Sequence, residues 1–213
     1  MQLHLFEIPK VEPVDFIPRF VSANQLDSRN VDEVVSMLLD DAESLFGTRI
    51  DPSPYSFGGV YFGSDVPQMK YRLDEMKIVI RLSQCARNDN GKILWQLAHE
   101  CLHLLSPVRL WTTMLEEGLA CWYQLRWTKI CPQLFSKTFL TPETAFGGPT
   151  HRYFEAFSMV DEILKNDQDS IKRIRAAQPI ISKITPTQLV REITQLDIPT
   201  AKKLSSRFST KKH

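Results

Sequence analysis

Two histidines and a glutamate stand at a spacing that suits metal chemistry. His99, Glu100 and His103 belong to the pattern His-Glu-Cys-Leu-His. Because residues four apart share a helix face, His99 and His103 can each present a ring nitrogen to one metal ion. Glu100 falls beside such an ion, where a carboxylate can accept a proton from a water molecule. The pattern therefore predicts a Zn²⁺ site with Glu100 as its general base.

A catalytic zinc ion needs a third protein ligand, with one position left open for water. The next predicted helix offers two carboxylates, Glu116 and Glu117. Thr113 and Glu116 fit a capping box, in which both side chains satisfy backbone donors at a helix start. Glu117 is left as the predicted zinc ligand. The alternative is that Glu117 is an acid favoured only by the positive end of the helix dipole.

These two motifs resemble the gluzincin superfamily of zinc metallopeptidases, in which HExxH on one helix is completed by a glutamate on the next. The segments HECLH and EEGLA carry the resemblance. Aminopeptidase members commonly have Asn-Glu-Gly-x-Ala at the second segment. The glutamate of that motif binds zinc in those relatives, and it corresponds to Glu117 in this chain. Thirteen residues separate His103 from Glu117, fewer than in the large aminopeptidases, so the resemblance implies a compact member.

A second, shorter resemblance concerns the oxyanion. Tyr153 begins the segment Tyr-Phe-Glu-Ala-Phe, which is similar to the Tyr-Glu-x-Gly-Phe start of a later helix in aminopeptidase relatives. The tyrosine of that helix stabilises the oxyanion, which implies the same role for Tyr153. His151 is the alternative candidate, because an imidazolium aimed at developing negative charge has the same electrostatic effect.

Two family features are changed in this chain. Thermolysin-like relatives carry an aspartate four residues after the glutamate ligand, where it supports a zinc-bound histidine, and here that position is Cys121. The support must come from elsewhere. The Gly-x-Met-Glu-Asn motif that reads a free amino terminus is absent, since the nearest glycine pair begins Gly58-Gly59-Val60. Aminopeptidase specificity is therefore not expected.

The elements that must position these residues follow from hydrophobic periodicity. Apolar residues at helical spacing predict helices over residues 31–46, 91–105 and 113–127. Residues 51–87 are rich in turn, β-branched and aromatic residues and predict a small sheet that includes GVYFG and MKIVIRL. A loop is expected over 131–150. Further helices are expected in the segments 151–165, 169–178, 186–196 and 199–208.

The expected fold is α+β and zincin-like, with a small sheet followed by a predominantly helical part that includes the active-site helix. One domain is expected over residues 1–213, with an irregular lead-in over 1–27 and a helical extension over 167–213.

Three residues are candidates for binding substrate. In zincins, the strand before the motif helix runs along the cleft edge and binds the substrate backbone by strand addition. Residues 76–82 have the expected place in the sequence, which makes Ile78 and Ile80 candidates. The alternative is a plain buried strand. Trp111, in the short loop between the two metal helices, is a candidate for lining the substrate pocket.

Composition narrows the functional classes. The 213 residues include 26 basic and 25 acidic side chains, for a net charge of +1, which argues against non-specific nucleic-acid binding. Glu7 and Pro9 interrupt any signal-peptide core, and no segment is apolar enough to span a membrane, so a cytoplasmic location is expected. The four scattered cysteines are expected to be buried free thiols.

The predicted function is hydrolysis of a peptide bond in a peptide or protein substrate by a zinc-activated water, with Glu100 as the base. One alternative is a catalytically inactive zinc-binding regulatory or peptide-binding protein of the same fold, although the presence of Glu100 speaks against it. The other is a helical protein with an accidental motif. The sequence does not fix the oligomeric state, the substrate or the cleavage preference.

Overall fold

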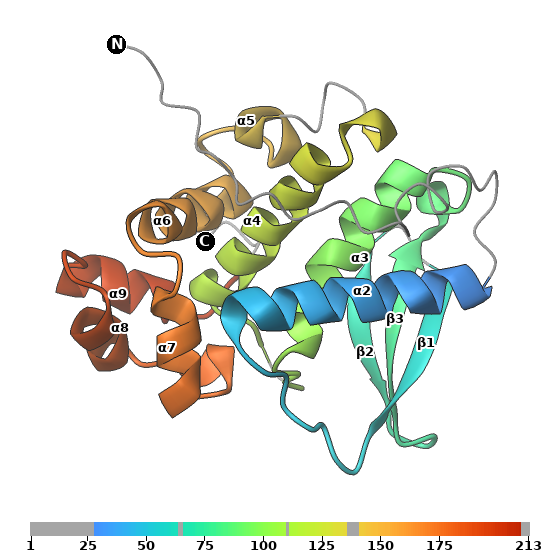
Figure 1. Cartoon of the computed structure of the whole chain (residues 1–213), viewed down its shortest axis with the longest axis horizontal. Coiled ribbons are helices and arrows are strands. Elements are labelled where there is room, and N and C mark those ends of the chain that lie inside the picture. Colours follow the sequence, from blue (N-terminus) through green and yellow to red (C-terminus); the bar gives the residue numbers. More distant parts are fainter. Residues whose placement is uncertain (1–27, 64–65, 110, 136–140, 210–213) are drawn as a thin grey trace.

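The computed structural model describes residues 28–63, 66–109, 111–135 and 141–209. The lead-in predicted for residues 1–27 lies outside the described residues. In the described part, the chain is α+β, with one small sheet and a larger helical part (Figure 1).

The sheet has three strands: β1 (Ser56–Gly63), β2 (Gln68–Arg72) and β3 (Lys77–Ser83). Their order is β1-β3-β2, with β1 parallel and β2 antiparallel to β3. Helices α2 (Ser28–Phe46) and α3 (Asn90–Leu104) pack against this sheet (Figure 1). The apolar residues Ile78, Val79, Ile80 and Leu82 explain the central place of β3, because a strand between two others and under helices buries its apolar side chains.

The strand order corrects one expectation. Strand β3, which contains Ile78 and Ile80, is the central strand, and its backbone is paired on both sides. It therefore cannot accept an added peptide strand. The edge strand beside it is β2, in which Met69 pairs with Ile80. Of the two alternatives for residues 76–82, the structure shows the buried strand.

The helical part begins with α4 (Met114–Ile130), which packs against both α3 and α6 (Arg152–Asn166). The described residues of the predicted loop over 131–150 include a 3₁₀ turn, Pro132–Leu134, and a short helix, α5 (Pro142–Ala145). Helices α7 (Ser170–Ala177), α8 (Pro186–Glu192) and α9 (Ile198–Leu204) follow. The predicted helices are thus present, with shifted ends.

The last predicted helix ends earlier than expected. Helix α9 stops at Leu204, and the chain then runs back along the start of α4. Met114 donates its backbone N–H to the carbonyl of Ser206 over 3.0 Å, and Phe208 donates its own to the carbonyl of Thr112 over 2.9 Å. This C-terminal segment, residues 206–208, therefore borders the start of the helix that carries Glu117.

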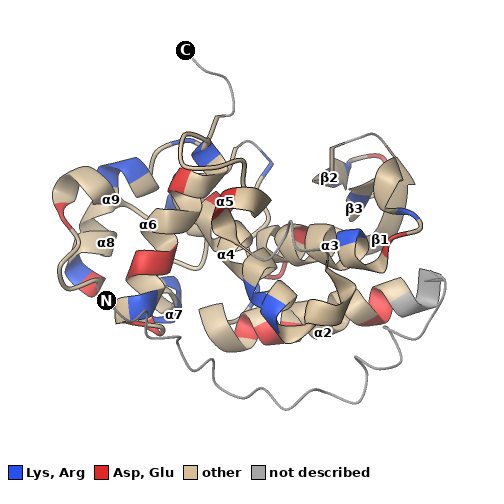
Figure 2. Cartoon of the chain, turned by 90° about the horizontal axis from the view of Figure 1, so that it is seen from above, with Lys and Arg blue, Asp and Glu red and all other residues tan. Residues whose placement is uncertain are grey.

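The main hydrophobic core joins the two parts of the molecule. It includes buried side chains from α2, β3, α3, α4 and the C-terminal helices. Tyr123 on α4 is fully buried, and its hydroxyl donates to the carbonyl of Leu38 on α2 over 2.6 Å. Basic and acidic residues are interspersed over the described helices (Figure 2).

Two findings concern earlier expectations. All four cysteines are free, but Cys85 is exposed whereas Cys101, Cys121 and Cys131 are buried. Among the described helices, none has both the length and the apolar stretch needed to cross a bilayer.

Candidate metal centre

Helix α3 presents both histidines from one face. The helix begins where the Asp89 side chain accepts the backbone N–H of Lys92 over 2.9 Å. Its apolar side chains are buried in the core, so the position of the helix on the sheet is fixed by packing. His99 and His103, one turn apart, then face α4 with their rings 4.9 Å apart.

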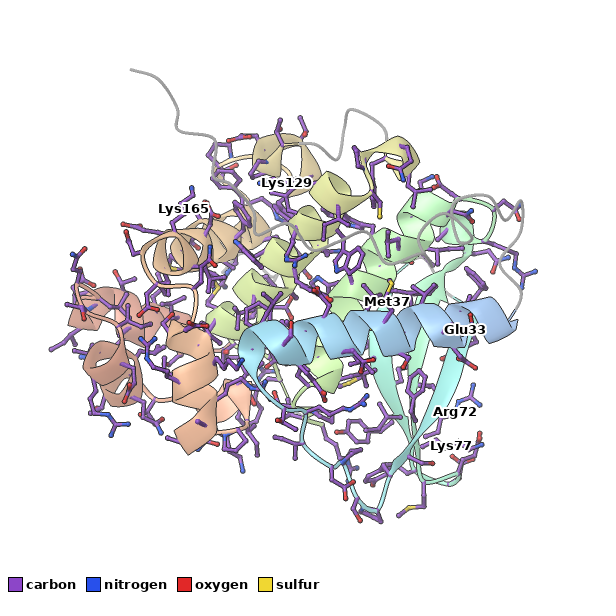
Figure 3. All side chains as sticks on the ribbon, viewed as in Figure 1. Glu33, Met37, Arg72, Lys77, Lys129 and Lys165 are labelled. Atoms are coloured by element: carbon purple, nitrogen blue, oxygen red, sulfur yellow. The ribbon has the colours of Figure 1, made fainter. Side chains whose placement is uncertain are left out.

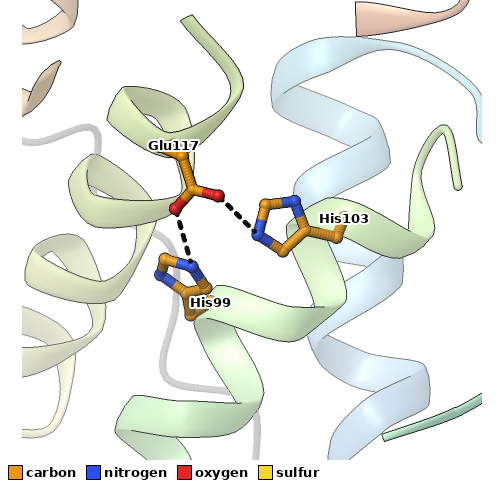
Figure 4. A group of neighbouring side chains, drawn as sticks. All are labelled: His99, His103 and Glu117. Atoms are coloured by element: carbon orange, nitrogen blue, oxygen red, sulfur yellow. Dashed lines mark ion pairs between the residues drawn. The ribbon is translucent and has the colours of Figure 1, made fainter. Parts of the chain in front are cut away.

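Helix α4 brings Glu117 to the same place. The Thr113 hydroxyl caps this helix by accepting the N–H of Glu116, so both glutamates lie in the first turn, where the helix dipole favours a negative charge. Figure 4 shows the carboxylate of Glu117 directed at both imidazoles. Its Oε2 lies 3.3 Å from His99 Nε2, and its Oε1 lies 3.7 Å from His103 Nε2.

These distances fit the ligand set of one metal ion. The three side chains offer ligand atoms that all lie within 4.8 Å of one another. Ligands of a tetrahedral zinc at about 2.0–2.2 Å from the ion stand about 3.3–3.6 Å apart. The 3.3 Å distance from Glu117 to His99 matches such an edge, and the 3.7 Å distance from Glu117 to His103 is slightly longer. His99, His103 and Glu117 can therefore hold a metal ion together.

An unsatisfied oxygen supports this conclusion. Glu117 is 6% exposed, and its Oε2 is buried without a hydrogen-bond partner among the described residues, although His99 Nε2 is near. The other oxygen, Oε1, accepts the hydroxyl proton of Thr112 over 2.6 Å. A buried carboxylate oxygen without a partner is costly unless it binds a cation. The donor set of two imidazoles and one carboxylate is one that zinc accepts.

Hydrogen bonds to the far ring nitrogens orient both histidines. His99 Nδ1 lies 3.1 Å from Gln124 Oε1, and His103 Nδ1 lies 2.8 Å from Glu116 Oε1. Both partners are acceptors, so each Nδ1 carries the proton and donates it. The lone pair of each Nε2 is then free to face the ion.

Glu116 has a different role from the one predicted. The capping box is only half formed, because Thr113 caps the helix but the Glu116 side chain bonds His103. The support missing at Cys121 is therefore supplied by Glu116 and Gln124. Gln124 was not predicted from the sequence, but a signal existed: it lies seven residues after Glu117, two turns along the same helix face.

The charges of the metal-free site are strongly coupled. Burial alone would lower the pKa of His103, but its hydrogen bond to Glu116 and the charge of Glu117 raise that pKa to about 10. The pKa of His99 is also raised, because Glu117 outweighs the effect of burial. Burial alone would raise the pKa of Glu117, but the two imidazoles lower it to about 2. The imidazoles and the carboxylate thus favour one another's charged forms, so a metal ion would compete with protons for the centre.

Glu100 lies beside the three ligands and is tied to the sheet. Its side chain is buried, and its Oε2 accepts the backbone N–H of Met69 on β2 over 2.6 Å. The predicted general base therefore has a fixed orientation between the metal helix and the edge strand. Since Glu100 is not one of the three grouped ligands, it is free to handle a proton.

Of the two predicted oxyanion residues, only Tyr153 lines the cleft. Its ring lies 6.3 Å from that of His99, and burial, followed by the charge of Glu117, raises the pKa of its phenol. His151 is exposed, stacks on the far side of Tyr153 and accepts the backbone N–H of that residue as the cap of α6. The structure thus assigns His151 a local structural contact.

The site opens into a cleft of about 670 Å³. Strand β2 forms one wall, and the loop before α4 forms another. Trp111, 47% exposed, lines the cleft as predicted. Ile78 and Ile80 do not, because their side chains are at most 1% exposed and belong to the core. The C-terminal segment lies beside the cleft, where the ring centres of Phe208 and Tyr153 are 4.8 Å apart.

No protein-family model matches the chain, and neither a curated protein nor a solved structure matches it. Its function is therefore inferred from the geometry of the site.

Proposed function

We propose that this protein is a zinc-dependent metallopeptidase of compact gluzincin type. The observation that carries the proposal is the convergence of His99, His103 and Glu117, whose ligand atoms lie within 4.8 Å of one another, with Glu100 beside them. Hydrogen bonds hold the Nδ1 atoms of both histidines, and as a result both Nε2 atoms face the carboxylate of Glu117. Two histidines with only a packing role would not need this arrangement. The open cleft at this point gives a substrate access to the centre.

The residues divide the chemistry between them. When bound, zinc supplies Lewis acidity, which polarises the scissile carbonyl and lowers the pKa of a water to about 7. Glu100 accepts the proton of the attacking water and later delivers it to the leaving amine. Tyr153 donates its phenol proton to the tetrahedral oxyanion. Because burial keeps the pKa of Tyr153 raised, the phenol stays protonated at neutral pH.

Strand β2 is the element that would hold the substrate backbone. It is paired only with β3 among the described strands, so one edge faces the cleft. A peptide in extended conformation can add to such an edge through main-chain hydrogen bonds. Met69, the second residue of β2, donates its backbone N–H to Glu100, so an added peptide would lie next to the general base.

The test is the metal content of protein purified without added zinc, together with cleavage of a mixed library of quenched fluorescent peptides. We expect about one zinc per chain in the wild type and in Glu100→Gln. His103→Ala and Glu117→Ala should lose the metal. His151→Ala is the matched control, because it removes a described histidine outside the ligand set.

Cleavage should be abolished in Glu100→Gln while zinc is retained. A wild-type protein that takes up no zinc would contradict the proposal. Zinc retention without hydrolysis of any peptide would instead favour the inactive zinc-binding protein.

A further inference from the structure

We infer that the cleft selects peptides with acidic side chains on both sides of the scissile bond. This inference deepens the proposed function, on which it rests, by naming its substrate class. It is carried by the positive charges among the residues that line the cleft, whereas basic and acidic residues are interspersed over the described helices (Figure 2).

The described residues that line the cleft include three cations and two acids. The cations are Lys70, Arg81 and Arg109. The acids are Glu100 and Glu117, and both are assigned to the metal centre and to proton transfer. Among the described lining residues, every charge left to meet a substrate side chain is therefore positive.

The cations flank the point at which Met69 binds Glu100. Lys70, on the edge strand β2, is the next residue after Met69. Arg81 comes from β3 and donates to the carbonyl of Val66, which precedes β2, over 3.2 Å. Arg109 is exposed on the loop before α4, and its guanidinium lies 5.9 Å from the ring centre of Tyr71 on β2. Side chains on either side of the scissile bond of a peptide along β2 would thus meet positive charge.

These cations lack an internal counter-charge. Some cations outside the cleft, such as Arg72, Lys77 and Lys165, pair with nearby carboxylates. Others, such as Arg87 and Lys129, lie outside the cleft without such a pair among the described residues. Lys70, Arg81 and Arg109 have no carboxylate within 4.0 Å among the described residues. A fourth cation, Arg207, lies 5.6 Å over the ring of Trp111 and also has none. The charge at the cleft is therefore available to a ligand.

The wall geometry favours a peptide as the acidic ligand. Apart from the Met69 N–H, which binds Glu100, the edge of β2 that no described strand pairs offers backbone donors and acceptors that match the backbone of an extended peptide. Cations beside that edge can then form ion pairs with acidic side chains of the peptide. A nucleic acid has no comparable main chain to add to the sheet, so the acidic peptide is the occupant that uses both features.

The test compares two rhodamine-labelled decapeptides with blocked ends by fluorescence anisotropy. One peptide carries glutamates on both sides of a central Leu-Leu pair, and the other has glutamine at each glutamate. The binding protein is Glu100→Gln, so that the probes are not cut. We expect the acidic probe to bind about five- to tenfold more tightly at low salt, with the difference shrinking towards about 0.5 M salt.

Matched variants connect the preference to the cleft. Lys70→Gln and Arg109→Gln should each weaken binding of the acidic probe about two- to fivefold and leave the neutral probe unchanged. Lys129→Gln is the control for Lys70: it is an exposed lysine on α4, far from the sheet (Figure 3). Arg87→Gln is the control for Arg109, because Arg87 also lies over an aromatic ring, that of Phe62, yet does not line the cleft.

Equal binding of the two probes would overturn the inference, as would equal effects of the cleft and control variants. A single-stranded oligonucleotide that bound more tightly than the acidic probe and lost affinity in the same cleft variants would also overturn it. Cleavage of the probes by wild-type protein separates the two proposals. Zinc-dependent cleavage without acidic preference contradicts only this inference, whereas acidic binding without zinc or cleavage contradicts only the proposed function.

Discussion

At the scale of single residues, the candidate metal centre depends on the groups behind the histidines as much as on the ligands. Glu116 and Gln124 accept the Nδ1 protons of His103 and His99. Such partners fix the ring orientation and the tautomer, so that the metal meets a lone pair without first reorganising the site. Their removal should therefore weaken metal binding without removing any ligand.

We predict that Glu116→Ala lowers zinc affinity about 10- to 100-fold, because His103 loses its acceptor. Glu116→Gln retains an oxygen at the acceptor position and should lose much less. The measurement is zinc competition against a chromophoric chelator, with circular dichroism to confirm the fold. Equal affinity in wild type and Glu116→Ala would show that the 2.8 Å contact does not orient the ligand.

The raised pKa values of the histidines predict a proton release on zinc binding. With a pKa of about 10, metal-free His103 carries a proton at neutral pH, whereas Glu117, with a pKa of about 2, carries none. Zinc must displace the histidine proton. Zinc affinity should therefore rise with pH up to about pH 10 and fall as pH is lowered.

Isothermal titration in buffers with different ionisation enthalpies measures the number of protons released. We expect about one to two per zinc at pH 7, from His103 and His99. A binding enthalpy that is the same in every buffer would contradict the prediction, since it would mean that no proton leaves.

At the scale of elements, the sequence predicts the helices better than the sheet edge. Helices α3 and α4 are visible because apolar residues recur at helical spacing and Pro107 interrupts the chain between them. Strand β2 is short, and its residues Gln68–Arg72 are mostly polar or charged. Such a strand forms because it pairs with β3, and a pattern within the strand itself does not predict that non-local contact. The sequence therefore points to the central strand β3, and the edge strand β2 becomes apparent only in the structure.

The same distinction applies to the site. His99 and His103 follow from their spacing on one helix, whereas the prediction of Glu117 rests on assigning Glu116 to a capping box and on the gluzincin resemblance. The contacts of Met69 with Glu100 and of Gln124 with His99 depend on how different elements pack together. The spacing of residues along one element does not predict such contacts.

The contact between α4 and α6 gives a prediction at this scale. Gly118 follows the ligand Glu117, and a Cβ at this position would lie 2.3 Å from the carbonyl oxygen of Ala156 on α6. Gly118→Ala should destabilise the fold by about 1–3 kcal/mol, because the backbone of α6 must move to remove the clash. This exceeds the gain of about 1 kcal/mol that alanine brings to a helix.

Urea denaturation measures the stability change, with Lys129→Ala on the same helix as an exposed control. Since α6 also carries Tyr153, Gly118→Ala should lower kcat for peptide cleavage while zinc remains bound. An unchanged or raised unfolding free energy would show that α6 yields without strain.

At the scale of the whole molecule, the C-terminal helices are part of the structure that supports the site. Arg175 on α7 is 3% exposed and donates to carbonyl groups at the ends of two distant helices. It reaches Phe46 at the end of α2 over 2.7 Å and Leu105 just after α3 over 3.2 Å. Helix α3 ends one residue after His103. Arg175 therefore connects the C-terminal helices to the end of the helix that carries the two histidines.

Burial lowers the pKa of Arg175 to about 10, yet the group remains charged at neutral pH and satisfies several helix-end carbonyls. We predict that Arg175→Met lowers the unfolding free energy by about 3 kcal/mol or more, because those carbonyls stay buried without donors. Arg173→Met is the matched control, since Arg173 is exposed on the same helix and pairs with Asp167. It should leave the unfolding midpoint nearly unchanged.

Both variants should be compared by urea denaturation with and without added zinc. Zinc binds the folded state, so it should raise the stability of each protein by the same amount if Arg175 acts only through the fold. A smaller zinc effect in Arg175→Met than in Arg173→Met would mean that the end of α3 has moved and taken His103 with it. Equal stability of the two variants would show that the carbonyls find other donors and that the C-terminal helices do not hold the metal helix.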